Sequence, residues 1–545
     1  MGKGNKGKGK ASSGAGDQKS LRSAAEAAVN EAVKLQDSAS DLGPVGAAAA
    51  LEAAAQRYRE ALARLPGHAE ASYNLATCLS EQADLKANTR EKVVLLRESR
   101  SILESVIAAD TSGRGATTAL AHHALGNVIR GVVETFRDHC PTYAYTAAAV
   151  AATAAVPCED CGVPCPSAAE CRQELLQACR HLETAVSITE RLQNQSGDIE
   201  EILVHLGDTF ASMMQMVMDG ASAGRGLSSH GPPPEAGAVQ DALALCSSAC
   251  GKYSEALSTS TSSGGSDTDI LRLKAGTVVN FLDWALPEAP LPQHQHPPSG
   301  AGFSAEELGL LATAEQTVGV LLGLDGDNVG GLLAKGDLCR LRARVSMLSA
   351  SAAGMGTQGM QGAQEEGSHR EGSLSWLARA VQRYPEDSEA LAAAGEGLLE
   401  YGRRSVAVYK QAAMSAQGGF GSCALPAPHH LEGMRMSAVS RLQEAGSLLS
   451  RASSIDTSDT DSPYNAACAF ALSGDAASCF QALSEFCRRL AGTVATPGGV
   501  SSATRDAARW SLREAGGDVD LESVRGTEWF VGLLHSTDVA LGGGA

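Results

Sequence analysis

Residues 54–79, AAQRYREALARLPGHAEASYNLATCL, decide the fold that we predict for this chain. Three residues spaced by four and then three positions share one face of a first helix: Ala54, Tyr58 and Ala61. Pro66 ends that helix, because proline has no amide proton and disfavours helical geometry in the residue before it. A second helix follows, with Leu75 and Ala76 on its inner face. Small residues at the crossing point let two antiparallel helices approach closely.

The same arrangement recurs along the chain with an uneven period. Further triplets with the first-helix spacing begin at Ser99, Ala178, Ala249, Ala314, Ser373 and Ala445. A small residue is expected in the helix that follows each of them, at Gly126, Gly207, Gly276, Gly336, Gly395 and Ala466. One match of this kind is weak, but many in phase predict stacked helical hairpins that share a continuous core.

This unit resembles the tetratricopeptide repeat (TPR), a helix–turn–helix of about 34 residues. The resemblance implies an all-α fold: a right-handed α-α superhelix of about seven or eight irregular hairpins, with a disordered tail and disordered loops. The composition agrees, since hydrophobic residues make up 43% of the chain and aromatic residues only 4%. An apolar content of mainly Ala, Leu and Val suits closely packed helices.

The predicted array spans residues 21–534, between a disordered basic tail at 1–20 and a disordered C-terminus at 535–545. The tail has lysines among glycines and no apolar anchor, so it cannot offset the entropy of ordering. The clearest units are 54–79, 178–210, 314–339, 373–398 and 445–486. Insertions are expected at 131–172, 220–236, 286–302, 350–373 and 414–430. A closing helix is expected to cover the last apolar face with Trp529, Phe530, Leu533 and Leu534.

Net charge and cysteine content limit the classes of function. A net charge of −18 argues against a nucleic-acid-binding body. No signal peptide precedes the 14 cysteines, so we expect free thiols in a reducing compartment, a cytoplasmic or nuclear location and no secretion. The apolar run Ala147–Val156 is too short to cross a bilayer, and no association with a membrane is expected.

A cysteine cluster is the candidate metal site in the sequence. Cys158, Cys161, Cys165 and Cys171 have the spacing C-x2-C-x3-C-x5-C, which contains the short hairpin spacing that zinc sites use. The second pair departs from C-x2-C and prolines crowd the segment. Unliganded or redox-sensitive thiols are therefore the favoured interpretation, and structural zinc is the alternative. We find no hydrolase motif and no supported Cys–His dyad, so we expect no enzyme activity and no cofactor.

The resemblance also implies where a partner binds. In TPR proteins the first helix of each unit lines a concave groove through its second, fifth, sixth and ninth positions. Mapped onto this chain, these positions are Glu70, Tyr73, Asn74, Thr77, His123, Asn127, Glu201, His205, Asp208, Lys274, Asp337, Glu389 and Glu396. Acidic residues outnumber the single lysine, so a basic or mixed basic–apolar segment of a protein is the expected ligand.

Members that bind chaperone tails hold a C-terminal carboxylate with a Lys–Arg pair on one unit and asparagines on its neighbours. Asn74 matches one such asparagine, but no unit carries the pair, and Glu70 and Glu389 have the opposite charge. Because carboxylate capture needs cationic donors, we do not expect a receptor for chaperone tails.

Two hypotheses for the function follow from the sequence. The leading one is a non-catalytic scaffold or adaptor that holds a protein segment in the groove. The alternative is an RNA- or ribosome-associated assembly factor that docks through its lysine-rich tail, with nucleic acid bound only there.

Overall fold

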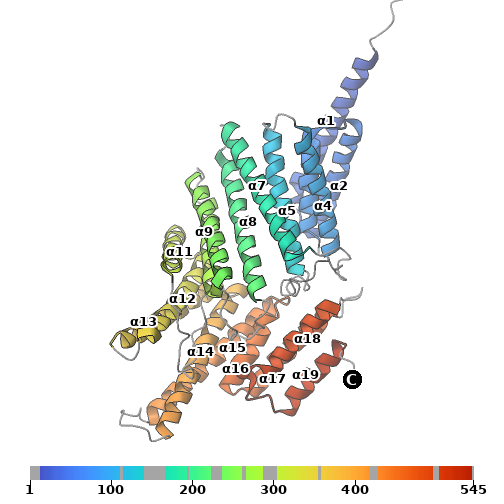
Figure 1. The fold of residues 1–545 in the computed structure, drawn as a ribbon. Coiled ribbons are helices and arrows are strands. Elements are labelled where there is room, and N and C mark those ends of the chain that lie inside the picture. Colours follow the sequence, from blue (N-terminus) through green and yellow to red (C-terminus); the bar gives the residue numbers. More distant parts are fainter. Residues whose placement is uncertain are drawn as a thin grey trace, which may run out of the picture. The chain divides into compact units, whose positions relative to one another are not determined.

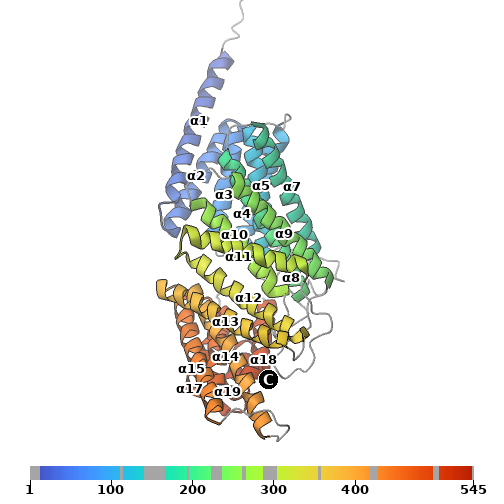
Figure 2. The ribbon, with the colours of Figure 1, turned by 90° about the vertical axis from the view of Figure 1, so that its left-hand side faces the viewer.

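The computed structural model describes residues 13–86, 88–110, 115–139, 166–192, 196–222, 236–259, 265–285, 304–353, 357–417, 428–494 and 502–542. Within these ranges every regular element is a helix, as the sequence predicts, and the helices lie side by side in antiparallel pairs (Figure 1, Figure 2). The chain divides into two units, residues 1–213 with 258–261, and residues 214–257 with 262–545. Each unit has hydrophobic cores of its own.

Unit 1 contains the hairpin from which the fold was predicted. Its helices are α1 (Ser13–Ala39), α2 (Pro44–Arg64), α3 (Ala69–Asp84), α4 (Thr89–Ala109), α5 (Ala116–His139), α7 (Ala168–Leu192) and, as far as Met213, α8 (Ser196–Ser222). After α2 the chain turns at Pro66 and Gly67, whose φ of 83° lies in the left-handed region that glycine tolerates. The side chain of His68 then caps α3 by accepting a hydrogen bond from the amide of Ala71. The α2–α3 hairpin is therefore the one expected from residues 54–79.

Unit 2 continues the same construction. After the end of α8 its helices are α9 (Ala236–Thr259), α10 (Gly265–Ala285), α11 (Ala305–Leu324), α12 (Val329–Ala353), α13 (Thr357–Arg383), α14 (Ser388–Gln417), α15 (Pro428–Ile455), α16 (Asp461–Ser473), α17 (Ala476–Val494), α18 (Ser502–Gly517), the short 3-10 helix η1 (Val519–Leu521) and α19 (Glu528–Ala540). Residues 325–328 form the turn between α11 and α12.

Contacts also join alternate helices, which are separated by one helix in the chain order. In unit 1 α3 contacts α5, and side chains of α5 bond to α8. In unit 2 α10 contacts α12, α12 contacts α14, and α14 contacts α16. We call these alternate helices the A layer: α3, α5 and α8 in unit 1, and the end of α8, α10, α12, α14 and α16 in unit 2. Such contacts are expected of stacked hairpins, because equivalent helices of successive hairpins become neighbours.

Glycines in the A layer mark the places where helices nearly touch. A Cβ added to Gly126 would lie 2.7 Å from Leu182 Cγ, and one added to Gly395 would lie 2.5 Å from Leu449 Cγ. Gly336 meets Leu377 in the same way, at 2.7 Å. Each of these leucines is the middle residue of a predicted triplet, which confirms the small-residue positions in these three hairpins.

The prediction for Gly276 is wrong. Gly276 is exposed on α10, and a Cβ added there would have no neighbour within 4 Å. The preceding residue, Ala275, is fully buried in the core of unit 2. The inward face of α10 is therefore one residue out of phase with the pattern, and alanine is small enough for this contact.

The helices extend further than the sequence pattern indicates. α1 begins at Ser13, inside the tail predicted to be disordered, and α19 reaches Ala540, beyond the predicted end of the array. α13 covers most of the predicted insertion 350–373, where an ion pair between buried Glu366 and Arg370 anchors a sequence that looked irregular. The ends of α5, α7, α8, α14 and α15 similarly enter the insertions 131–172, 220–236 and 414–430, while the whole of 286–302 lies outside the described residues.

α19 covers the core at the end of unit 2, as the sequence predicts. Phe530 is buried, with 2% of its surface exposed, and Trp529, Leu533 and Leu534 pack against the same core. The Trp529 ring meets Phe480 of α17 edge-on, with 5.3 Å between ring centroids. Large aromatic side chains contribute much of the apolar area that such a contact removes from water.

One helix in the described part of the chain, α11, is long and apolar enough to cross a membrane by length and composition alone. Only 28% of its most apolar stretch is buried, and five of its residues are buried where it packs with α10 and α12: Leu311, Ala314, Thr317, Val318 and Leu321. Core helices of soluble proteins pass the same test of length and composition.

Replacing Gly395 by alanine tests the close approach. We expect Gly395→Ala to lower the free energy of unfolding by about 1–3 kcal/mol, because Leu449 or the helices must move. Urea denaturation of the full chain measures this change. The control is Gly276→Ala, which meets nothing and should be neutral or stabilising by up to about 1 kcal/mol. Equal effects of the two substitutions would contradict the packing described here.

Candidate functional site

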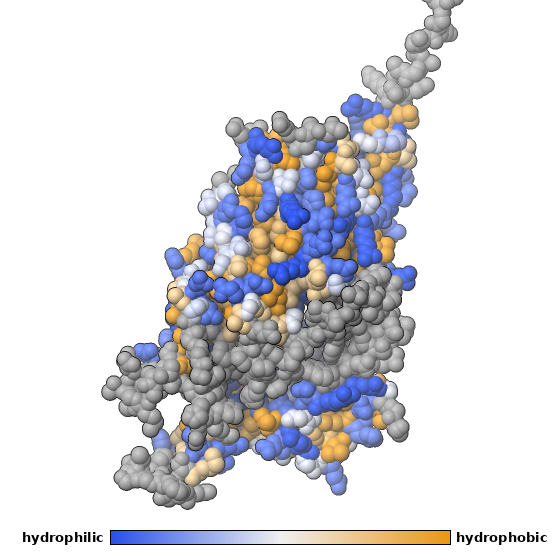
Figure 3. Space-filling model, in the orientation of Figure 1, coloured by the Kyte–Doolittle hydropathy of each residue, from blue (hydrophilic) through white to orange (hydrophobic). Residues whose placement is uncertain are grey.

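The thirteen predicted groove residues all lie on A-layer helices. They are distributed over α3 (Glu70, Tyr73, Asn74, Thr77), α5 (His123, Asn127), α8 (Glu201, His205, Asp208), α10 (Lys274), α12 (Asp337) and α14 (Glu389, Glu396). Most of them are partly or fully exposed, and the side chain of His123 is buried. Figure 3 shows hydrophilic and hydrophobic residues mixed across the face of unit 1 that it displays.

In unit 1, α5 and α8 are joined side by side by polar contacts. Nε2 of His123 lies 2.7 Å from Nδ1 of His205, and Nδ2 of Asn127 lies 2.9 Å from the same Nδ1. One turn further, the guanidinium of Arg130 lies 2.8 Å from the carboxylate of Asp208. Four of the predicted residues thus belong to one cluster, although the two helices are far apart in the sequence.

The two rings of this cluster are neutral at pH 7. Burial lowers the pKa of His123 to about 3, and the charges of His205 and Arg130 add to the effect. Burial likewise lowers the pKa of His205 to about 4, with Arg130 acting in the same direction. Oδ1 of Asn127 is buried and accepts no hydrogen bond. The cluster therefore holds an unsatisfied acceptor beside two neutral imidazoles.

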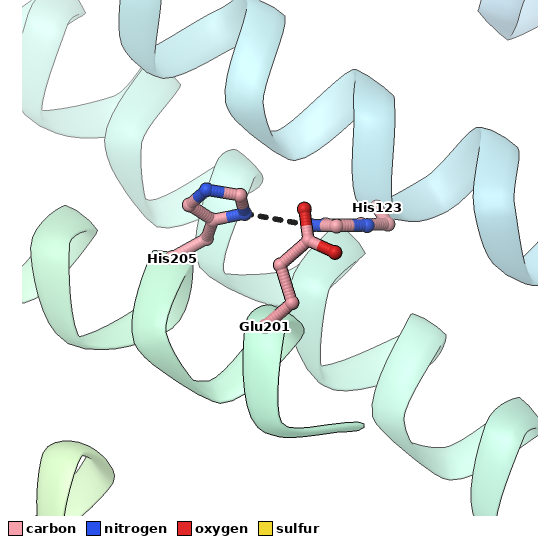
Figure 4. A group of neighbouring side chains, drawn as sticks. All are labelled: His123, Glu201 and His205. Atoms are coloured by element: carbon pink, nitrogen blue, oxygen red, sulfur yellow. Dashed lines mark hydrogen bonds between the residues drawn. The ribbon is translucent and has the colours of Figure 1, made fainter. Parts of the chain in front are cut away.

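Glu201 completes a group of three possible metal ligands. It precedes His205 by one helical turn, so both side chains leave the same face of α8. One ligand atom from each of His123, Glu201 and His205 lies within 4.8 Å of the other two. The Glu201 carboxylate lies beside the contact between the two rings (Figure 4).

A second pair of histidines lies next to the first. Nδ1 of His122, on α5, lies 2.9 Å from Nδ1 of His181, on α7. Burial lowers the pKa of His122 to about 4, and burial also lowers that of His181. Among the described residues, no third His, Cys, Asp or Glu completes a group of ligands around this pair.

The described chain holds one other group of this kind, Cys468 with Asp518 and Asp520 in unit 2. Its carboxylates already have partners, since Tyr464 donates a hydrogen bond to Asp518 and Arg403 forms an ion pair with Asp520. Burial raises the pKa of the Cys468 thiol well above its usual value. This group is therefore poorly suited to a metal, which binds the thiolate.

The predicted cysteine cluster is only partly described. Cys158, Cys161 and Cys165 lie outside the described residues. Cys171 is fully buried on α7 and forms no disulfide. Whether these cysteines bind zinc stays a prediction.

In unit 2 the A layer carries a cluster of carboxylates, which we call the acidic surface. It comprises Asp283 on α10, Asp337 on α12, Glu389, Glu396 and Glu400 on α14, and Asp461 on α16. Arg340 lies among them, 3.0 Å from Asp337, 3.7 Å from Asp283 and 4.0 Å from Glu400. Arg344 pairs with Asp283 at 3.0 Å. Arg370 of α13 pairs with Glu400 at 3.5 Å, so the six carboxylates have three guanidinium groups as partners.

Burial and mutual repulsion destabilise the ionised form of two carboxyl groups of the acidic surface. Burial raises the pKa of Asp337, and Asp283 and Glu389 raise it further against the effect of Arg340 and Arg344. Burial also raises the pKa of Glu396, with Asp461 and Asp337 acting in the same direction. Each carboxyl therefore loses part of the stability of its ionised form on folding.

Sequence reasoning missed the arginines of the A layer. Arg130, Arg340 and Arg344 lie outside the four positions that the TPR resemblance assigns to a groove. The acidic groove positions are consequently less negative than they look in the sequence, since Asp208 and Asp337 have cationic partners. One signal could have found Arg340: it follows Asp337 by three residues, a spacing at which helical side chains meet.

A pocket of about 590 Å³ lies between α13, α14 and α15 in unit 2. Its walls include Arg370, Arg404 and Arg441, together with Glu366 and Tyr401. Arg404 pairs with Glu366 at 2.7 Å, and the guanidinium of Arg441 stacks 3.8 Å above the ring of Tyr401. Because its cations already have carboxylate or aromatic partners, this pocket is less open to a charged ligand than the acidic surface.

Comparisons with known proteins identify no family and no sequence relative for the chain. No protein-family model matches the chain, and no curated protein matches its sequence. Similar solved structures include a circular tandem repeat protein with a novel repeat topology, at 11% identity and a TM-score of 0.27, covering 97% of this chain and 98% of that one. A monomeric mutant of IFIT1 with Gppp-AAAA has 11% identity and a TM-score of 0.22 over 77% of this chain and 90% of that one. The Cut9–Hcn1 hetero-tetramer of APC/C has 9% identity and a TM-score of 0.17 over 96% and 98%.

The class of protein rests on the packing of the chain itself. Consecutive helices pair as hairpins, glycines mark their closest approach, and alternate helices touch. The chain is an all-α protein of stacked, TPR-like helical hairpins.

Removing Arg340, the cation among the carboxylates of the acidic surface, should lower the stability of the fold. We expect Arg340→Met to destabilise the chain by about 3 kcal/mol at pH 7, because carboxylates are left partly buried without a partner. Adding Asp337→Asn should recover part of the loss. Urea denaturation measures both, and no recovery in the double variant would contradict the pairing.

Proposed function

We propose that the chain is a non-catalytic scaffold or adaptor, and that its acidic surface holds a basic or mixed basic–apolar segment of a partner protein. The observation that carries the proposal is the set of six carboxylates on four adjacent helices, which have three arginines as cationic partners: Arg340, Arg344 and Arg370. A lined surface of one sign sums the potentials of its charges and steers an oppositely charged ligand.

The repulsion between carboxylates of this surface supports the same proposal. Burial raises the pKa of Asp337, and the charges of Asp283 and Glu389 raise it further. A lysine or arginine side chain could donate to Asp283 and relieve the repulsion between Asp337 and Glu389. A cationic segment therefore replaces an internal cost with favourable contacts.

The sign of the surface argues against an acidic partner. The guanidinium groups of Arg340 and Arg344 face carboxylates of the chain itself, so they offer little to an incoming carboxylate. A chaperone tail, which ends in a carboxylate, remains an unexpected ligand for this surface.

We propose a reducing compartment for the protein, cytoplasmic or nuclear. The nine cysteines in the described ranges form no disulfide, and eight of them are buried, which supports this proposal. The alternative function, docking to RNA through the lysine-rich tail, concerns residues of which the first twelve lie outside the described ranges.

Reversing two charges of the acidic surface tests the proposed function. We expect Glu389→Lys with Glu396→Lys to weaken binding of a short fluorescent Lys/Leu peptide by about tenfold or more at low salt, mostly through slower association. Stopped-flow fluorescence and anisotropy measure the rate and the affinity.

The matched control changes the net charge by the same amount, at two positions of unit 2 outside the acidic surface. Glu444 on α15 and Glu522 are exposed, and Glu444→Lys with Glu522→Lys should leave peptide binding nearly unchanged. Tighter binding of the Asp/Leu counterpart of the peptide by the unmodified chain would contradict the proposal. So would equal losses in the two double variants.

Glu396→Gln should separate stability from binding. A carboxyl whose pKa is raised in the folded state favours folding below its unfolded pKa and loses that contribution as the pH rises through its folded pKa. Glu396→Gln should therefore raise the melting temperature at pH 7 but have little effect below pH 4, while it weakens binding of the Lys/Leu peptide. Calorimetric melts across this pH range check the sign, and destabilisation at pH 7 would contradict it.

A further inference from the structure

We propose that His123, Glu201 and His205 of unit 1 bind a divalent transition metal, with Zn²⁺ as the expected ion. No motif in the sequence points to this site, since its ligands come from two helices that an insertion separates. It is distinct from the acidic surface, which lies in unit 2.

The geometry of the three side chains carries the proposal. Glu201 and His205 leave one face of α8 one turn apart, which is a spacing that places two helical ligands on a single ion. His123 approaches from α5, with its Nε2 2.7 Å from Nδ1 of His205. Ligand atoms of all three residues lie within 4.8 Å of one another, so small side-chain rotations can bring them around one ion (Figure 4).

The chemistry of the ligands favours zinc. Imidazole nitrogens and a carboxylate oxygen form a set that Zn²⁺ uses with a fourth position left for water. Imidazole ligands also suit Cu²⁺, Ni²⁺ and Co²⁺, so Co²⁺ is a valid spectroscopic substitute. Neutral imidazole is the form that binds metals. The ring that donates the present hydrogen bond changes tautomer on binding, and no net proton is released.

The surroundings of the site are compatible with a bound ion. Nδ1 of His205 is contacted by two nitrogen atoms, Nε2 of His123 and Nδ2 of Asn127. Oδ1 of Asn127 is buried without a hydrogen bond. An ion bound to the two ring nitrogens would separate them. The Asn127 amide could then hydrogen-bond to a water on the ion, as polar groups next to metal ligands commonly do.

The neighbouring pair His122 and His181 provides a control within the chain. Its rings are in contact at 2.9 Å, but it lacks a third ligand among the described residues. Replacing this pair changes the same number of imidazoles on α5 and its partner helix without touching the proposed ligands.

The test uses the full chain under reducing conditions, with Zn²⁺ and Co²⁺ as probes. We expect the unmodified chain to bind one more Zn²⁺ than the His123→Ala/His205→Ala variant and to melt at a higher temperature when Zn²⁺ is added. The His122→Ala/His181→Ala variant should keep that extra ion. The Co²⁺ absorption lost with His123 and His205 should lack the sulfur-to-cobalt charge-transfer band that thiolates give, which separates this site from the 14 cysteines.

Glu201→Gln keeps the proposal testable if the double variant does not fold. Glu201 is exposed, so its amide should leave the circular dichroism spectrum unchanged while weakening Zn²⁺ affinity by tenfold or so. Equal Zn²⁺ binding by the unmodified chain, the His123→Ala/His205→Ala variant and the Glu201→Gln variant would overturn the proposal. A sulfur-to-cobalt charge-transfer band in the Co²⁺ absorption that depends on His123 and His205 would overturn it as well.

Discussion

The close approach of helices at small residues is the constraint on which the rest of the structure depends. Gly126, Gly336 and Gly395 each meet a leucine of the next hairpin at a distance that leaves no room for a Cβ. Because interiors are packed to high density, a larger residue at such a place would push the hairpins apart. Repetition of this contact fixes the offset between successive hairpins and makes the A-layer helices neighbours.

Neighbouring A-layer helices bring polar side chains together that are distant in the sequence. In unit 1 this produces neutral imidazoles, an amide and an Arg–Asp pair between α5 and α8. In unit 2 it produces carboxylates in excess over arginines. The first arrangement suits a metal ion and the second a cationic segment. One way of stacking helices thus presents two chemically different surfaces, one in each unit.

The spacing of small and large apolar residues was enough to predict helical hairpins and most of their contacts. Ala54, Tyr58 and Ala61 are all buried, as are the leucines that meet Gly126 and Gly395. The prediction was wrong at Gly276, where the buried small residue is the preceding Ala275. Because Ala and Gly are both small, the sequence pattern does not show which of the two faces the core. Helices inside Gln- and Ser-rich segments were missed, since the buried ion pair that holds α13 joins residues that look exposed in a sequence.

The candidate sites were predictable only in part. Placing groove residues on the A layer needed only the hairpin period, and all thirteen lie there. Pairing His123 with His205, which are 82 residues apart, depends on how α5 and α8 stack across an insertion, and no local pattern records it. The arginines that partner the acidic residues were missed for a related reason: long side chains reach charges that their own helix position does not indicate.

A double-mutant cycle across the interface tests the central claim most directly. The free energy of binding is measured for the unmodified chain and its Glu396→Gln and Glu444→Gln variants, each with the Lys/Leu peptide and with peptides in which one lysine at a time is replaced by glutamine. The account predicts a coupling energy of about 0.5–3 kcal/mol between Glu396 and at least one lysine, and none between that lysine and Glu444. Zero coupling to Glu396 at every lysine, or equal coupling to Glu444, would contradict it.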